Sequence, residues 1–244
     1  MTRLTVLHTN DLHGRLSSER ANAVQSIRRT IDHASLLFDA GDAVTAGNIT
    51  YKRSGEPILD LMSTVGYDGM VVGNREFHVW ERGFVSKLAL ARFPILSANI
   101  RRRDGGMPLP CMPSHTYYVD GRRITTLGLT VPMVTEQMAV RRLSAYLFDD
   151  PIETAARLVP SLRQECDMLI CLSHIGFEHD RCLAEQVEGI DLIIGGHSHT
   201  TLPQGESRGR AMIVHAGSHA RWLGRVDLEI GDRVSIVSAE LLPL

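Results

Sequence analysis

Residues 3–14 read RLTVLHTNDLHG, an apolar run that ends directly in Asp11-Leu12-His13. The alternation and the β-branched residues predict a short buried strand over residues 3–8. The polar residues lie where this strand gives way to a loop. The rest of the chain repeats the same arrangement, in which residue types that ligate metals follow a buried strand.

Further short apolar runs, each bounded by Gly, Asp or Asn, predict strands over residues 35–38, 69–72, 94–98, 168–172, 192–194 and 211–214. Amphipathic stretches predict helices over residues 20–32, 57–65, 81–91, 151–165 and 181–187. Hairpins are expected over residues 117–129 and 225–241, around Asp120-Gly121 and Gly231-Asp232. This alternation of short strands and helices predicts an α/β or layered α+β domain, with two stacked sheets flanked by helices.

The composition excludes several classes of protein. With 43% hydrophobic and 22% charged residues in 244, and with no linker or repeat, residues 1–244 are expected to form a single globular domain. A net charge of −2 gives no basic field, so nucleic acid is not an expected partner. No apolar stretch reaches the about 18 residues of a membrane span, and no secretory signal precedes the first strand, which predicts a cytoplasmic protein without a membrane segment.

Metal-ligating residue types follow five of the predicted strands. They are Asp11 and His13 after residues 3–8, Asp42 after 35–38, Asn74 after 69–72, His174 after 168–172, and His197 and His199 after 192–194. Because strand ends at one edge of a sheet converge, these side chains are expected to share one site. Glycines in the same motifs are expected to supply sharp, left-handed turns: Gly41, Gly73, Gly195 and Gly196.

The composition of this set indicates its chemistry. Carboxylate, amide and imidazole ligands together suit Mn, Fe, Co or Zn better than Ca or Mg, and Mn is the ion expected to serve in vitro. Two Asp, one Asn and four His are too many for one tetrahedral ion, but they fit two ions that share a carboxylate. Two ions roughly 3.5 to 4 Å apart form a clamp for phosphoryl displacement, so phosphoester hydrolysis is the leading prediction. Alone, Asp11–His13, Gly41-Asp42 and Gly73-Asn74 are also typical of an ordinary turn or helix cap, and His174 of a buried, hydrogen-bonded histidine, whereas Gly196–His199 is moderately specific by itself.

Taken together, these motifs resemble the calcineurin-like metallophosphoesterases, most closely the catalytic domain of the 5′-nucleotidase and cyclic phosphodiesterase branch. The resembling segments are Leu7–Gly14, Asp39–Asp42, Gly73–Phe77, Ser173-His174 and Gly195–Thr200, with Ala216–Ser218 and Leu223–Arg225 near the end. The resemblance implies a metallo-dependent phosphatase-like fold, a four-layer αββα sandwich of two mixed β-sheets flanked by helices. It also implies that Asp11, His13 and His199 hold one ion, that Asn74, His174 and His197 hold the other, and that Asp42 bridges them.

The third motif departs from the family pattern. The family reads GNHEFD, whereas this chain reads GNREFH, so Arg75 stands at the catalytic His and His78 at the acid that orients it. Arginine can hold phosphate oxygens but cannot donate a proton. We therefore expect Asn74 and Arg75 to bind the phosphate, with His78 or His219 as the proton donor and His219 also in contact with substrate.

A second departure concerns the substrate. The branch adds a C-terminal domain that grips the base, and no counterpart is expected within residues 1–244. A partner chain, a dimer neighbour in a homo-oligomer or the loop Arg101–Cys111 would have to replace it.

Three functional hypotheses follow. The first is a dinuclear-metal-dependent phosphoesterase in which hydroxide attacks the phosphorus of a small, nucleotide-like phosphomonoester or phosphodiester. The second, motivated by Arg75, is an attenuated homologue that acts as a metal-dependent ligand-binding or regulatory module. The third is an amidohydrolase that uses an HxH pair, but that architecture places the pair after its first strand, whereas His197 and His199 lie late in the chain.

Overall fold

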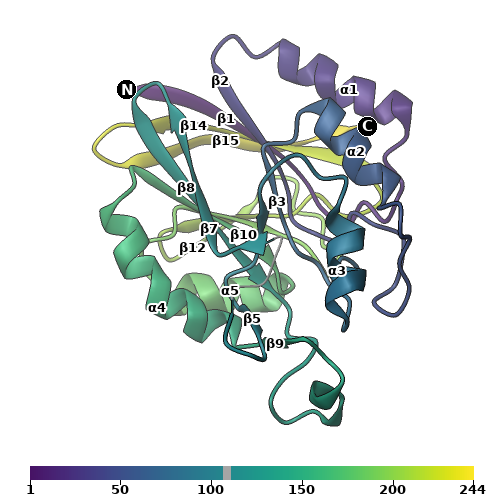
Figure 1. The fold of residues 1–244 in the computed structure, drawn as a ribbon. Helices are drawn as coiled ribbons and strands as arrows, with labels where there is room; N and C mark the ends of the chain where they lie inside the picture. Colours follow the sequence, from purple (N-terminus) through teal and green to yellow (C-terminus); the bar gives the residue numbers. More distant parts are fainter. Residues whose placement is uncertain (107–110) are drawn as a thin grey trace.

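In the computed structural model, which describes residues 1–106 and 111–244, the first predicted strand lies inside a seven-stranded sheet (Figure 1). In spatial order the strands are β15 (Val234–Pro243), β14 (Trp222–Ile230), β1 (Thr2–Thr9), β2 (Ala34–Asp39), β3 (Gly69–Val71), β4 (Ile95–Leu96) and β6 (Cys111–Met112). The neighbouring strands β1, β2, β3, β4 and β6 run parallel. Strand β14 pairs antiparallel with β1, and β15 pairs antiparallel with β14. The sheet is therefore mixed.

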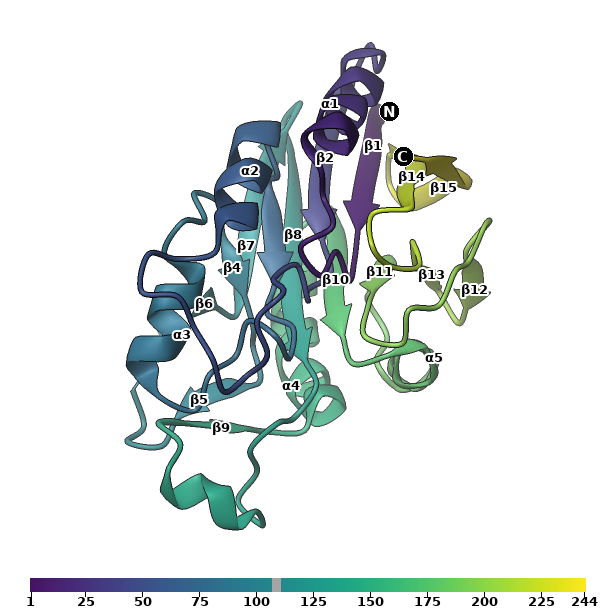
Figure 2. The same ribbon diagram turned by 90° about the vertical axis from the view of Figure 1, so that its right-hand side faces the viewer.

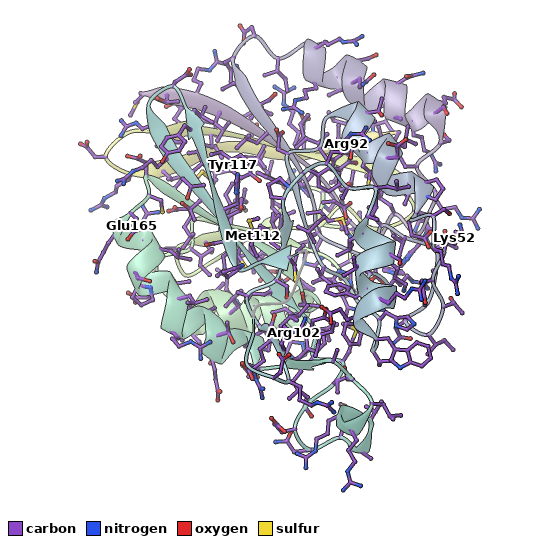
Figure 3. All side chains as sticks on the ribbon, in the orientation of Figure 1. Lys52, Arg92, Arg102, Met112, Tyr117 and Glu165 are labelled. Carbon is purple, nitrogen blue, oxygen red and sulfur yellow. The ribbon has the colours of Figure 1, made fainter. Side chains whose placement is uncertain are left out.

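A second, six-stranded mixed sheet contains strands between residues 114 and 214. Its order is β12 (Glu206–Arg208), β13 (Ala211–Val214), β11 (Leu192–Gly195), β10 (Met168–His174), β8 (Arg122–Thr130) and β7 (Ser114–Val119). Its four middle strands are parallel, and both edge strands are antiparallel. Tyr117 on β7 reaches the first sheet, where its hydroxyl donates to the Asp68 carbonyl at 2.7 Å (Figure 3).

Helices cover the outer faces of the two sheets, α1 to α3 on one side and α4 and α5 on the other (Figure 1). They are α1 (Ser18–Arg29), α2 (Pro57–Val65), α3 (Glu81–Leu88), α4 (Pro151–Gln164) and α5 (Phe177–Gln186), with a 3₁₀ turn at Ala139–Arg142. Successive residues of β1 alternate: Val6 packs in the apolar layer between the sheets, and Leu7 packs with the helices. This confirms the predicted αββα sandwich. No helix in the described ranges is long and apolar enough to cross a bilayer.

Several local boundaries differ from the expectation. The first helix begins at Ser18 because the Ser17 hydroxyl caps it by accepting the Arg20 N–H, and it ends at Arg29. The fifth helix begins at Phe177, four residues before the predicted start. A small sheet of β5 (Ile100–Arg102) and β9 (Tyr146–Phe148) was not predicted. Arg102 of β5, labelled in Figure 3, connects this small sheet to helix α3 through an ion pair with Glu81.

Candidate metal centre

The five motif loops come from both sheets. Three follow β1, β2 and β3 of the first sheet, and two follow β10 and β11 of the second. The arrowheads of β1, β2 and β10 point to the same end of the molecule (Figure 2), and the two sets of loops meet there. The expectation of a single sheet edge was therefore wrong, because the site lies across the carboxyl ends of two stacked sheets.

One group of ligand atoms comes from Asp11, His13 and His199. The two Nε2 atoms of the histidines lie 2.9 Å apart, and Asp11 Oδ1 lies 3.8 Å from His13 and 3.4 Å from His199. Ligands about 2.1 Å from a divalent ion lie about 3.4 Å from one another, so this spacing fits an ion. Asp11 Oδ1 is also buried without a hydrogen-bond partner in the described part of the chain, which leaves it available as a ligand.

A second group of atoms lies beside the first. Asn74 Oδ1 is 3.2 Å from His174 Nε2 and 3.0 Å from His197 Nδ1. The Nδ1 atom of His174 donates to the Ala40 carbonyl at 2.6 Å, which leaves Nε2 with a lone pair for the group. Asp42 lies between the two groups. Its Oδ1 lies 3.4 Å from His174 Nε2, and ligand atoms of Asp11, Asp42 and His174 gather closely enough to hold an ion, whereas its Oδ2 lies 4.0 Å from His13 Nδ1, the nitrogen that does not face His199.

Backbone strain is concentrated at these residues. Positive φ angles occur at Asp11, His13, Asp42, His197 and His199. Such conformations cost about 1 to 3 kcal/mol each in residues other than glycine and persist where surrounding bonds hold them. Here the Asp11 N–H donates to the Gly41 carbonyl at 2.9 Å, and the His13 N–H donates to the Asp42 carbonyl at 2.9 Å.

Of the four glycines expected to form left-handed turns, one does so and three have another role. Gly41 has a φ of +88°, in agreement with the prediction of a left-handed turn. The other three motif glycines do not have positive φ; instead, they permit close approach. A Cβ on Gly73 would lie 2.3 Å from the Asp42 nitrogen, one on Gly196 2.5 Å from the Ala40 oxygen, and one on Gly195 2.0 Å from His215 Nε2.

Two buried polar residues of the motifs had no predicted role. The carboxylate of Glu76 accepts the backbone N–H groups of Asp42, Val44 and Gly73 at 2.9, 3.0 and 2.8 Å, which joins the second and third motif loops. The amide of Asn10 donates to Asp11 Oδ2 at 2.8 Å and accepts the N–H of Ala216 at 2.8 Å. Their positions within the motifs were the available signal, but spacing alone could not reveal their partners.

Burial sets the electrostatics of the site. It raises the pKa of Asp11 to about 7, and burial together with the neighbouring Glu76 raises the pKa of Asp42 to about 8. Burial lowers the pKa of His13 to about 4 and that of His174 to about 3. The buried site thus disfavours both kinds of charged side chain, whereas a bound cation would favour ionised carboxylates and neutral imidazoles. The donor set therefore fits divalent ions.

Of the three other residues predicted to take part in the chemistry, two, Arg75 and His219, lie at the ligand groups. Arg75, which is 38% exposed, donates from Nη1 to the Thr45 carbonyl at 2.9 Å, and its Nε lies 3.6 Å from Asp42 Oδ2. The ring of His219 lies 5.2 Å from that of His13 and 5.9 Å from that of His199.

His78 lies elsewhere. Its Nδ1 accepts the Trp80 N–H at 3.0 Å, and its ring packs edge-on against Tyr51. The structure thus brings Arg75 and His219 to the ligand groups, while the described contacts of His78 do not reach them.

Comparison with known proteins agrees with this geometry. The family model of the calcineurin-like phosphoesterases matches residues 4–201. The trifunctional nucleotide phosphoesterase protein YfkN of Bacillus subtilis (strain 168) is 30% identical over 281 residues, which cover 94% of this chain and 18% of that protein. The 5′-nucleotidase of Homo sapiens is 30% identical over 291 residues, covering 99% of this chain and 49% of that protein. The chain thus spans less than half the length of either relative.

The fold is also similar to that of a solved structure. The NAD nucleotidase (NadN) of Haemophilus influenzae superposes with a TM-score of 0.82 at 22% identity, over 100% of this chain and 50% of that one. This likeness concerns the fold. Because the family match extends over most of the chain and includes all five motif loops, the chain belongs to the calcineurin-like phosphoesterase family.

Proposed function

We propose that residues 1–244 form the catalytic domain of a dinuclear-metal-dependent phosphoesterase that hydrolyses a small, nucleotide-like phosphomonoester or phosphodiester. The observation that carries the proposal is two adjacent ligand groups, Asp11 with His13 and His199, and Asp11 with Asp42 and His174. Asp42 also lies within 4.0 Å of His13 Nδ1, between the two groups. Asp11, His13 and His199 would hold one ion, Asn74, His174 and His197 the other, and Asp42 both. The nucleotide phosphoesterase and 5′-nucleotidase relatives support the substrate class.

Bound divalent ions supply Lewis-acid activation of water and neutralise charge on the phosphoryl oxygens. The mixed oxygen and nitrogen donors favour Mn, Fe, Co or Zn, and Mn is the ion to use first in vitro. The protein holds the ligands in place through the buried Glu76 and Asn10, which connect loops from distant parts of the chain.

Asn74 and Arg75 are assigned to the reacting phosphate. The Oδ1 atom of Asn74 faces the two histidines, which leaves its Nδ2 donors for a phosphoryl oxygen. The guanidinium of Arg75 has five donors, of which the described contacts use one for the Thr45 carbonyl. A planar fork of this kind stabilises the charge that builds up on phosphate oxygens.

We assign the leaving-group proton to His219. Arg75 stays charged and cannot donate a proton. The contacts of His78 with Tyr51 and Trp80 keep it outside the ligand groups. The Nδ1 atom of His219 contacts the Ser218 hydroxyl at 2.9 Å, which leaves its Nε2 for the substrate.

The alternative is a metal-dependent binding or regulatory module, and the observation that favours it is Arg75 in place of the family's proton-donating histidine. The test is the initial rate after chelation and Mn reloading on nitrophenyl phosphate, bis-nitrophenyl phosphate, 5′-AMP and cyclic nucleotides. The phosphoesterase predicts metal-dependent turnover that Asp42→Ala abolishes and that Asp232→Ala, in the exposed β14–β15 turn, retains. Metal binding without turnover above that of Asp42→Ala would favour the binding module.

A further inference from the structure

A strained loop lies beside the first ligand group. His219 and Ala220 have consecutive positive φ angles of 64° and 52°, and neither is glycine. The His219 N–H donates to the Asp11 carbonyl at 2.8 Å, and the His219 carbonyl accepts from Arg20 Nη1 at 2.9 Å. Strain that is held in place by such contacts is characteristic of functional sites. The loop thus fixes the His219 ring beside His13 and His199.

Two arginines join His219 at this side of the site. Arg221 folds back on the loop, donating from Nε to the Ser218 carbonyl at 3.2 Å and from Nη2 to the Ser218 hydroxyl at 3.1 Å. Arg15 is tied to the same loop through Arg20, whose Nη1 also donates to the Arg15 carbonyl at 3.2 Å. Because the same Nη1 atom donates to the His219 carbonyl, the backbone of Arg15 lies next to that of His219.

Within the part of the chain that the structure describes, these positive charges have no acidic partners. Within residues 1–106 and 111–244, neither Arg15 nor Arg221 forms an ion pair with a carboxylate. Elsewhere on the molecule many arginines are paired, as in Arg28 with Asp68 at 2.8 Å and Arg163 with Asp191 at 2.6 Å. Both unpaired side chains are exposed, so they can reach a ligand.

We propose that Arg15 and Arg221, placed around His219, form a second anion subsite that binds a phosphate group of the substrate other than the one that reacts. This inference rests on the proposed function and narrows it, because it predicts a substrate with at least two phosphate groups. The reacting phosphate already has Asn74 and Arg75 as its partners. Arg221 uses Nε and Nη2 on Ser218, which leaves Nη1 and the second N–H of Nη2 for phosphate oxygens, and the exposed Arg15 supplies a second guanidinium next to the same loop.

Phosphonates test the subsite without turnover, because hydrolysis does not cleave their carbon–phosphorus bonds. Binding of ethylphosphonate, ethane-1,2-diphosphonate and butane-1,4-diphosphonate to the Mn-loaded protein is measured by titration calorimetry, in buffer with excess free Mn. We expect at least one diphosphonate to bind about tenfold or more tightly than ethylphosphonate. The preferred spacer distinguishes neighbouring phosphates from separated ones.

Variants show whether Arg15 and Arg221 cause the tighter binding of diphosphonates. Arg15→Gln combined with Arg221→Gln is expected to bring the affinity ratio to within about twofold of unity. Arg233→Gln is the matched control, an exposed arginine at the turn between β14 and β15, and it is expected to keep the wild-type ratio. The two single variants serve if the double variant does not fold.

Equal binding of all three phosphonates, or a ratio that survives the double variant, would overturn the subsite. The proposed function fails separately. If hydrolysis is absent from the substrate panel while the binding ratio responds to the variants, the subsite stands and the phosphoesterase assignment falls. If hydrolysis is present and the ratio is unity, the reverse holds.

Discussion

Replacing Arg75 by histidine tests how this chain differs from the family pattern. The variant loses the hydrogen bond from Nη1 to the Thr45 carbonyl and the 3.6 Å approach of Nε to Asp42. It gains an imidazole next to Asn74, at the position of the family's catalytic histidine. Phosphate binding by the guanidinium is thus exchanged for a group that can donate a proton.

The two effects have opposite signs. A positioned general acid contributes typically 10²- to 10⁴-fold, and we expect at most about 10²-fold here because His78 is engaged with the Trp80 N–H and offers no carboxylate to orient the new imidazole. Loss of the partly exposed guanidinium costs about 1 kcal/mol, or about fivefold, for every phosphoester. The net prediction is faster hydrolysis of 5′-AMP, whose alcohol is a poor leaving group, and slower hydrolysis of nitrophenyl phosphate.

The assay compares kcat/KM for these two substrates in wild type, Arg75→His and Arg75→Gln. The ratio of 5′-AMP to nitrophenyl phosphate should rise in Arg75→His. It should stay constant in Arg75→Gln, which removes the charge without adding a proton donor. A ratio unchanged in Arg75→His would show that the side chain at position 75 takes no part in the chemistry.

Three further predictions concern the surroundings of the site. Glu76→Ala leaves three buried N–H groups without their acceptor and should lower the free energy of unfolding by about 3 to 5 kcal/mol, measured by urea denaturation of the ion-free protein; an effect below about 1 kcal/mol would contradict its bridging role. Burial raises the pKa of Asp11 to about 7 and of Asp42 to about 8, so these carboxyl groups keep protons in the folded ion-free protein that the unfolded chain has already lost. The histidines, whose pKa burial lowers, act in the opposite direction below about pH 7, so the melting temperature should fall as the pH rises from 7 to 9, and Mn should reverse that loss. A melting temperature that is independent of pH and Mn would oppose this. His219→Gln should reduce turnover of 5′-AMP more than that of nitrophenyl phosphate, and equal losses would mean that His219 binds substrate without donating a proton.

Most of the layered architecture could be predicted from short patterns. Buried strands such as β1 and β10 show as apolar runs, and the hairpin between β14 and β15 shows as a turn dipeptide between two such runs. The small β5–β9 sheet could not be predicted, because each strand is three residues long and its pairing joins segments distant in sequence. The division of the motif strands between two sheets depends equally on long-range pairing.

The candidate site shows the same limit. The residue types at strand ends indicated which side chains converge, but the role of each glycine depends on what lies opposite it, such as the Ala40 carbonyl beside Gly196. His78 stands at the position of the family's orienting acid, which suggested a role in the chemistry, yet its contacts are with Tyr51 and Trp80. Glu76 has no periodic signature, because its three partners are backbone groups of two loops.

A stoichiometric titration with Mn shows whether the protein holds two ions that share Asp42. Mn is added to the chelated protein while bound ions per chain and the initial rate on nitrophenyl phosphate are followed together. We expect two bound ions per chain, with activity that appears mainly with the second, and loss of both features in Asp42→Ala. Full activity with a single bound ion, or two ions bound equally well by Asp42→Ala, would contradict it.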